Sequence, residues 1–273
     1  MLFDAHTHLN FEKYDEAKRE NLAKEIRGSQ IKYIMDAGDT LESSMQVVKN
    51  CEKYDFCYGA VGIHPHNAKD IDEETLLFIE NLAKKNKIMA IGEIGLDYHY
   101  NKSERDVQKY WFRKQIKLAN KLKMPIMIHS RSADQDTLDI LKQEDAFSDE
   151  RKSWFPRRKG PYEEDARVQI HCYSGSKEMA LQYIALGATI SIAGPITYKN
   201  NRKTVEVVQT IPIEYLLSET DAPYLAPVPF RGRENKSVYV EHVVRRIALL
   251  KQINYEEAAD ITLNNAKVFF NIK

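Results

Sequence analysis

Short apolar runs alternate with longer amphipathic segments from one end of the chain to the other. Eight of the runs are short and lie close to turn residues such as Gly62, Gly95 and Pro125, which favours buried parallel strands over core helices. These runs cover residues 2–8, 31–35, 58–63, 88–94, 126–129, 168–171, 189–192 and 215–218. Between them the apolar residues have helical spacing, as in the segment after Ser103, in 177–186 and in the last segment, which opens at Asn254.

This alternation predicts an α/β fold, a single (β/α)8 TIM barrel that spans residues 1–273. Parallel strands need crossover connections, and helical sequence follows each predicted strand. A doubly wound open sheet would show the same alternation, so periodicity alone leaves both folds open. The polar residues favour the barrel, because residue types that bind metals end or follow five of the eight strands. The active sites of barrel enzymes lie at the carboxyl ends of their strands.

One stretch breaks the alternation. Residues 145–167 are polar and charged without a clear period, and they predict a loop inserted before the strand at 168–171. Two aromatic residues, Trp154 and Phe155, stand there among five cations: Arg151, Lys152, Arg157, Arg158 and Lys159. Cations and rings together are suited to gripping a flexible nucleic-acid strand. A solvated loop is the alternative, and the acidic residues at 163–165 favour it.

The composition excludes several classes of protein. Hydrophobic residues make up 43% of the 273 positions and charged residues 29%, which is typical of a soluble globular chain. Forty basic residues balance forty acidic ones, so the net charge provides no long-range attraction to nucleic acid. A polyanionic substrate would therefore have to be held by local positive charge or by metal.

The cysteines and the apolar runs indicate a cytoplasmic protein. Cys51, Cys57 and Cys172 cannot all pair and form no C-x-x-C motif, so we expect reduced thiols. The first residues show no signal-peptide pattern, and no segment approaches the ~20 consecutive apolar residues of a membrane span. We expect no association with a membrane and no obligate protein partner.

Two histidines near the start of the chain are candidate metal ligands. Asp4, His6 and His8 alternate along the strand at 2–8, so regular strand geometry predicts that all three point into the barrel. Two imidazoles that converge on one point suit a divalent metal, which neutral histidine nitrogen binds well.

Four further ligand-type residues lie at or beyond the ends of later strands. Glu93 falls in an apolar, glycine-rich run, where an unpaired carboxylate would be costly to bury. His129 and His171 end the strands at 126–129 and 168–171, and Asp221 follows the last strand. A salt bridge for Glu93 or a structural core histidine would explain one such residue. Six residues of metal-binding types at the same end of one barrel instead predict a metal site.

Three further residues lie close enough to the predicted ligands to be considered for a role at the site. His64 and His66 lie just beyond the strand at 58–63, where they would contact substrate or donate a proton, and His66 is as readily a loop residue without a role. Cys172 adjoins His171, but alternation along a strand points it toward the helices. It has no orienting base, so we do not expect it to act as a nucleophile.

With these residues in hand, the chain resembles the TatD family of metal-dependent deoxyribonucleases, a branch of the amidohydrolase-like barrels. The resemblance covers nearly the whole length and rests on motifs that follow one another in order. They are FDAHTHLN at 3–10, GIHPH at 62–66, GEIGLDY at 92–98, HSR at 129–131, HCYSG at 171–175, ETDAPYLAP at 219–227 and RGREN at 231–235. The insertion at 145–167 is longer than the family pattern leads us to expect.

The resemblance implies a site with two divalent ions, magnesium, manganese or zinc, bridged by Glu93. His6, His8 and Asp221 would complete one ion, and His129 and His171 the other. Asp221 would act as the general base, and His64 would contact the scissile phosphate. Arg131, Arg231 and Arg233 are candidate phosphate contacts. DNA is the implied substrate, with 3'-5' exonuclease activity as one form of the reaction.

Two other functions fit the same residues. A metal site of this kind can also hydrolyse another ester, an amide or an aminoacyl linkage, because its ligands do not distinguish attack at carbon from attack at phosphorus. A non-catalytic nucleic-acid-binding protein could retain the outline of the site. The presence of all six candidate ligand residues argues against a non-catalytic binding protein, since a binding module does not need this polar pocket.

Overall fold

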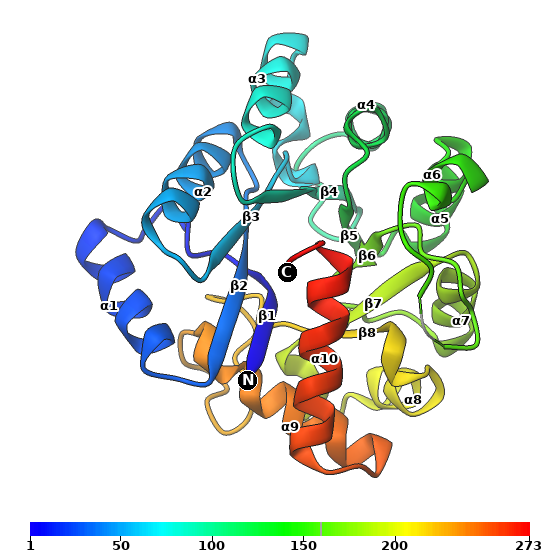
Figure 1. The fold of residues 1–273 in the computed structure, drawn as a ribbon. Helices are drawn as coiled ribbons and strands as arrows, with labels where there is room; N and C mark the ends of the chain where they lie inside the picture. The colour runs from blue at the N-terminus through cyan, green and yellow to red at the C-terminus, as the bar shows by residue number, and fades with distance from the viewer. Residues whose placement is uncertain (159) are drawn as a thin grey trace.

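The computed structural model describes residues 1–158 and 160–273 and contains eight parallel strands, each paired with its neighbours in chain order. The strands are β1 (Leu2–Thr7), β2 (Ile31–Ala37), β3 (Cys57–Val61), β4 (Ile88–Asp97), β5 (Ile126–Arg131), β6 (Val168–Ile170), β7 (Ala188–Ile192) and β8 (Leu216–Ser218). All eight coincide with predicted strands to within a few residues at each end. The predicted TIM barrel is confirmed, and Figure 1 shows the strands inside a ring of helices.

Most of the helices begin after a residue whose side chain caps the first turn. They are α1 (Glu16–Arg27), α2 (Leu41–Lys53), α3 (Glu73–Ala83), α4 (Arg105–Leu122), α5 (Asp134–Gln143), α6 (Asp149–Ser153), α7 (Lys177–Ala185), α8 (Arg202–Thr210), α9 (Val240–Lys251) and α10 (Tyr255–Phe269). Ser176 caps α7 and Asn254 caps α10, each accepting a hydrogen bond from a backbone N–H in the first turn. Among the described residues no helix is long and apolar enough to cross a membrane.

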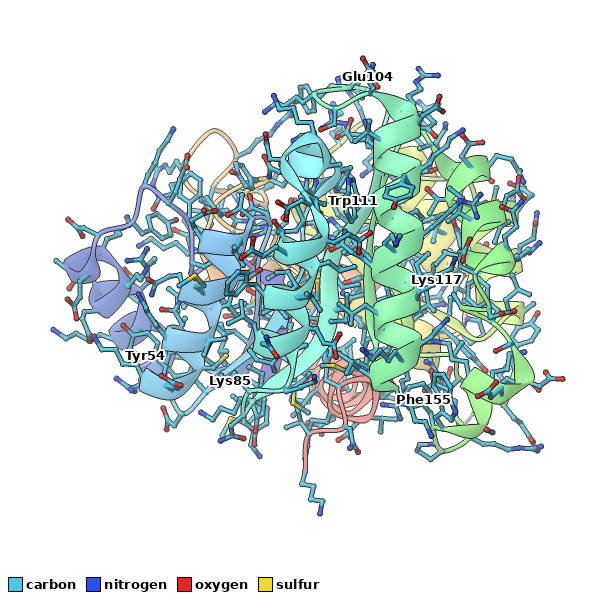
Figure 2. The ribbon with its side chains drawn as sticks, turned by 90° about the horizontal axis from the view of Figure 1, so that it is seen from above. Tyr54, Lys85, Glu104, Trp111, Lys117 and Phe155 are labelled. Carbon is cyan, nitrogen blue, oxygen red and sulfur yellow. The ribbon has the colours of Figure 1, made fainter. Side chains whose placement is uncertain are left out.

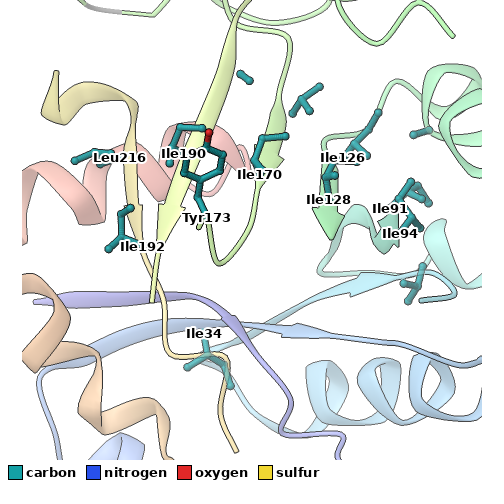
Figure 3. Packing of buried hydrophobic residues seen from close by; sticks show 14 of the residues in the cluster. Ile34, Ile91, Ile94, Ile126, Ile128, Ile170, Tyr173, Ile190, Ile192 and Leu216 are labelled. Carbon is teal, nitrogen blue, oxygen red and sulfur yellow. The ribbon is translucent and has the colours of Figure 1, made fainter. Parts of the chain in front are cut away.

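Two apolar clusters hold the barrel together. The larger lies between the strands and the surrounding helices, where Ile91, Ile128 and Ile170 are among the buried strand residues (Figure 3). Full burial of one such side chain is worth about 1.5–3 kcal/mol. The smaller cluster joins Phe3 and Met127 of the strands to Phe270, directly after α10. Helix α10 crosses the end of the barrel in Figure 1 and closes the amino ends of the strands.

The barrel closes between β8 and β1 through the residues that follow β8. The backbone N–H of Asp221 donates to the carbonyl of His6 at 2.9 Å, and the N–H of His8 donates to the carbonyl of Ala222 at 2.7 Å. Thr7 and Ala222 form an isolated parallel bridge at the same place. Candidate site residues therefore contribute main-chain hydrogen bonds to the closure of the barrel.

The segment 145–167 lies at the end of the molecule opposite the carboxyl ends of the strands. It connects α5 to the start of β6 and contains the short helix α6. In Figure 2, Phe155 lies at the opposite end of the molecule from Glu104, which directly precedes α4 and lies shortly after the carboxyl end of β4. Lys159, one of the five cations that surround Trp154 and Phe155, lies outside the described residues. This position places the segment far from the candidate site.

Arg151 is buried, so the interpretation of this residue as a contact for a nucleic-acid strand is wrong. Its guanidinium donates hydrogen bonds at 2.7–2.8 Å to three acceptors, the carbonyls of Ala166 and Met124 and the side-chain oxygen of Asn120. Arg151 therefore ties the segment to the end of α4 and the start of β6. This arginine, in a run that the sequence suggested was exposed, has a structural role in the fold.

We predict that Arg151→Leu lowers the free energy of unfolding by about 2–5 kcal/mol, because it leaves three buried acceptors without a donor. Urea denaturation followed by circular dichroism measures the change. Arg157→Leu is the matched control, since Arg157 is exposed and pairs with the exposed Glu163. That variant should stay within about 0.5 kcal/mol of the parent. Equal effects of the two substitutions would contradict the structural role of Arg151.

Candidate metal centre

The structure brings all six predicted ligand residues together at the carboxyl ends of the strands. His6, Glu93 and His129 lie within β1, β4 and β5, while His8, His171 and Asp221 follow the ends of β1, β6 and β8. Among the described residues, three overlapping groups have ligand atoms that lie within 4.8 Å of one another. The groups are His6 with His8 and Glu93, His6 with His171 and Asp221, and His64 with Glu93 and His129.

The two carboxylate oxygens of Glu93 face different histidines. Oε2 lies 3.4 Å from Nε2 of His6 and 3.9 Å from Nε2 of His8. Oε1 lies 2.7 Å from Nδ1 of His129 and 2.9 Å from Nε2 of His171. Asp221 belongs to the first side, because its Oδ1 is 3.3 Å from Nε2 of His8. Glu93 therefore stands between two sets of nitrogens, with one oxygen toward each.

Each of these four histidines has an acceptor at the ring nitrogen that points away from the cluster. The pairs are His6 Nδ1 with Met127 Sδ at 2.8 Å, His8 Nδ1 with the carbonyl of Ala37 at 2.8 Å, His129 Nε2 with Asp97 Oδ2 at 3.2 Å, and His171 Nδ1 with Glu219 Oε1 at 3.2 Å. An acceptor at the far nitrogen holds the ring proton there. In the neutral ring the near nitrogen is then unprotonated, as a metal ligand must be.

His64 has the opposite arrangement. Its Nε2 lies 3.5 Å from Oε1 of Glu93, inside the cluster, but its Nδ1 accepts a hydrogen bond from the backbone N–H of His66 at 3.1 Å. In the neutral ring the proton must then sit on Nε2. Burial, followed by the neighbouring His129, holds the pKa of His64 well below its usual range, so the ring is neutral. His64 therefore presents an N–H donor to the site.

Burial and mutual attraction fix the charges of the cluster. Burial alone would raise the pKa of the Glu93 carboxyl, but the imidazoles of His171 and His64 outweigh it and hold that pKa well below its usual range. Burial would lower the pKa of His8, but the hydrogen bond to Asp221 raises it to about 9. Glu93 is therefore a carboxylate at neutral pH, and a metal ion must displace the proton on His8. Metal affinity should rise with pH for that reason.

Asp4 does not point into the barrel with His6 and His8, so the prediction of one shared face is wrong. Its carboxylate accepts hydrogen bonds from the N–H and hydroxyl of Thr220, at 2.8 and 2.6 Å. The pairing of β1 with β2 is irregular between Asp4 and Thr7, which breaks the two-residue period that the prediction assumed. Asp4 instead supports the residue that precedes Asp221.

The prediction that Cys172 points toward the helices is also not supported. Strand β6 ends at Ile170, and Cys172 has φ of 45°, so strand alternation does not extend to it. Burial raises the pKa of the Cys172 thiol well above its usual range, and the carboxylate of Asp221 adds to that effect. The thiol is therefore near the site but remains protonated, which makes it a poor nucleophile.

Two carboxylates that orient the site were missed in the sequence analysis. Asp97, the last residue of β4, accepts hydrogen bonds from both His129 and His66. Glu219, directly after β8, accepts from His171, from the N–H of Cys172 and from Ser191. Both acids directly end or follow apolar strand runs, as the predicted ligands do. Their position at the strand ends could have identified them from the sequence. Because His66 bonds Asp97, His66 has a structural role.

The three predicted phosphate-binding arginines lie on the same side of the barrel as the cluster. Arg131 ends β5, and its guanidinium lies 4.7 Å above the ring of Tyr100. Arg231 belongs to the segment after β8, and its guanidinium lies 4.5 Å above the ring of Tyr198. Arg233 is exposed two residues further along. None of the three arginines lies among the candidate ligand groups.

The donor set fits divalent metal. Imidazole nitrogens and carboxylate oxygens are the ligands that zinc, manganese and related ions take in proteins. Here four imidazoles have their proton-bearing nitrogens turned outward, and two ionised carboxylates complete the set. A TIM barrel with this centre at its strand ends belongs to the class of metal-dependent hydrolases.

Comparison with known proteins identifies the family within that class. The chain belongs to the TatD family: the family model described as TatD related DNase matches residues 3–271. The uncharacterized metal-dependent hydrolase YabD of Bacillus subtilis is 41% identical over 272 residues, 100% of both chains. The 3'-5' ssDNA/RNA exonuclease TatD of Erwinia tasmaniensis is 30% identical over 260 residues, 93% of this chain and 94% of the relative.

A solved structure supports the same assignment. The crystal structure of YJJV, a TatD homolog from Escherichia coli K12, superposes with a TM-score of 0.87 at 26% sequence identity. The match covers 100% of this chain and 98% of that one. The predicted family is therefore confirmed by sequence and by fold.

We predict that Asp97→Asn and Glu219→Gln each weaken metal binding about 10–100-fold, because a carboxylate that holds the far nitrogen of a ligand histidine fixes its tautomer and orientation. Competition with a chromophoric chelator measures the affinity. Asp136→Asn is the control, since Asp136 bonds Tyr98 and Lys109 outside the cluster. Unchanged metal affinity in both Asp97→Asn and Glu219→Gln would show that these acids do not orient the ligands.

Proposed function

We propose that this metal-dependent hydrolase is a deoxyribonuclease that cleaves phosphodiester bonds at a centre of two divalent ions. The observation that carries the proposal is the position of Glu93, whose two oxygens face two separate sets of histidine nitrogens. A carboxylate in that position is suited to bridging two ions. The Erwinia tasmaniensis relative, named as a 3'-5' ssDNA/RNA exonuclease, supports nucleic acid as the substrate.

In this proposal the residues on each side of Glu93 would hold one ion. His6, His8 and Asp221 would hold one with Oε2, and His129 and His171 would hold the other with Oε1. When bound, such ions supply Lewis-acid chemistry that polarises water and a phosphoryl oxygen. The residues favour no single metal, and magnesium, manganese and zinc all remain candidates.

The surrounding residues supply proton transfer and substrate contacts. Burial would raise the pKa of Asp221, but the hydrogen bond from His8 keeps that pKa below its usual value, so the group is ionised at neutral pH, as a general base must be. His64 would donate its Nε2–H to a phosphate oxygen. Arg131, Arg231 and Arg233, on the same side of the barrel, would hold neighbouring phosphates.

Hydrolysis of single- and double-stranded DNA across a panel of magnesium, manganese and zinc tests the function. Small carboxylic esters and amides are assayed in parallel with the same preparations. The proposal expects DNA cleavage that a chelator abolishes and that added metal restores. Turnover of an ester or amide without any cleavage of DNA would replace it with the other hydrolase function.

We predict that Glu93→Ala and Asp221→Ala each lower turnover on DNA by about a hundredfold or more, because each removes a ligand and a charge from the site. Both proteins should remain folded, as judged by circular dichroism. Glu256→Ala, at an exposed carboxylate near the start of α10, is the control and should keep normal turnover. Near-normal turnover of metal-saturated Glu93→Ala would rule out the bridging role.

We predict that His64→Ala lowers turnover while the metal content stays unchanged, because the ring proton of His64 faces the site. Elemental analysis of the purified variant measures the metal directly. His129→Ala is the matched comparison and should lose about one equivalent of metal. The same loss in His64→Ala would move His64 into the set of ligands.

A further inference from the structure

Two tyrosines next to the metal centre have half-exposed side chains. Tyr100 lies three residues beyond β4 and is 54% exposed, and Tyr224 lies in the segment after β8 and is 50% exposed. Single exposed apolar residues are common and need no explanation by themselves. These two differ because each is fixed against a different side of the same centre.

Tyr224 lies on the side of His8 and Asp221. Its backbone N–H donates to the carbonyl of Asp221 at 2.8 Å, and its ring centre is 6.1 Å from that of His8, with the two planes at 73°. Phe11 meets the same ring edge to face at 5.9 Å. The ring is therefore held beside the histidines that face Oε2 of Glu93.

Tyr100 lies on the other side of Glu93. Its backbone N–H donates to Oδ1 of Asp97 at 2.8 Å, and its ring centre is 5.4 Å from that of His66. The same Asp97 bonds His129, which faces Oε1 of Glu93. The guanidinium of Arg131 lies 4.7 Å above the ring, so a cation accompanies this aromatic side chain.

We propose that Tyr100 and Tyr224 each stack on a nucleobase, one on either side of the phosphate bound at the metal centre. This inference rests on the proposed nuclease function and names the residues that select the substrate. Aromatic side chains stack on any base, so the site would tolerate different sequences. Bases in a duplex stack on one another and pair, so only unpaired nucleotides reach the two rings. The two rings would therefore provide the physical basis for a preference for single strands, the substrate named for the Erwinia tasmaniensis relative.

The first test is kinetic. Tyr100→Ala and Tyr224→Ala should each raise KM for a short single-stranded oligonucleotide about tenfold, with a smaller effect on kcat. Tyr100→Trp and Tyr224→Phe keep an aromatic ring and should stay close to the parent. Tyr255→Ala is the matched control, because the guanidinium of Arg245 lies 4.2 Å above the Tyr255 ring, as Arg131 does above Tyr100. Tyr255 bonds Gln30 at the amino ends of the strands, far from the centre.

The second test removes the bases instead of the rings. An oligonucleotide with abasic sites flanking the cleaved bond should bind the parent protein about as weakly as the alanine variants bind the normal strand. The alanine variants should lose nothing further on the abasic strand. A strand that carries 2-aminopurine next to the scissile bond reports stacking through quenching of the 2-aminopurine fluorescence. Phosphorothioate linkages prevent cleavage of that strand during the measurement. Each alanine variant should quench the fluorescence less than the parent protein does.

Three outcomes would overturn the proposal, and together they distinguish its failure from a failure of the nuclease function. If the parent cleaves normal and abasic strands with equal KM, the rings do not stack on bases, and the protein remains a nuclease. If the parent neither cleaves any nucleic acid nor quenches 2-aminopurine but hydrolyses a small ester, both the nuclease function and the stacking role are wrong. Equal KM for blunt duplex and single strand would likewise contradict the selection of unpaired bases.

Discussion

The structure of the centre depends on the burial of one carboxylate, Glu93. An ionised carboxylate taken out of water without partners is strongly unfavourable, so its surroundings must supply positive charge or hydrogen-bond donors. Five imidazoles from four different strand ends meet that need. Four of these imidazoles in turn require acceptors for their outer nitrogens, which are supplied by Asp97, Glu219, Ala37 and Met127. One buried charge thus determines the residue types at the mouth of most of the barrel.

The fold could be predicted from the sequence because its signals are local. Short apolar runs between amphipathic segments gave all eight strands, and the ligand-type residues at their ends indicated a barrel with one polar mouth. The six expected ligands also came together, because the carboxyl ends of parallel strands in a barrel necessarily meet. The TatD motifs pointed to the same residues.

The wrong or missing predictions concern residues where the backbone departs from regular strand geometry, or residues whose hydrogen-bond partners are distant in sequence. The direction of Asp4 followed from a two-residue period, and the irregular pairing in β1 broke that period. Cys172 was assigned a direction by strand alternation, although β6 ends before it. The burial of Arg151 and the hydrogen bond from His171 to Glu219 depend on contacts between segments that local spacing does not encode.

The closing of the barrel floor by the last helix has a consequence for the order of assembly. Phe269 and Phe270 fill the amino end of the barrel against Phe3, and the carbonyl of Phe269 accepts a hydrogen bond from the buried Arg167 at 2.6 Å. A ribosome adds these residues after every strand has been synthesised. During translation the inner apolar surface of the nascent barrel therefore lacks its cover until the final turn of α10 emerges. Strand β1 and helix α10 complete the same cluster, so the nascent chain remains exposed to aggregation until α10 has been made.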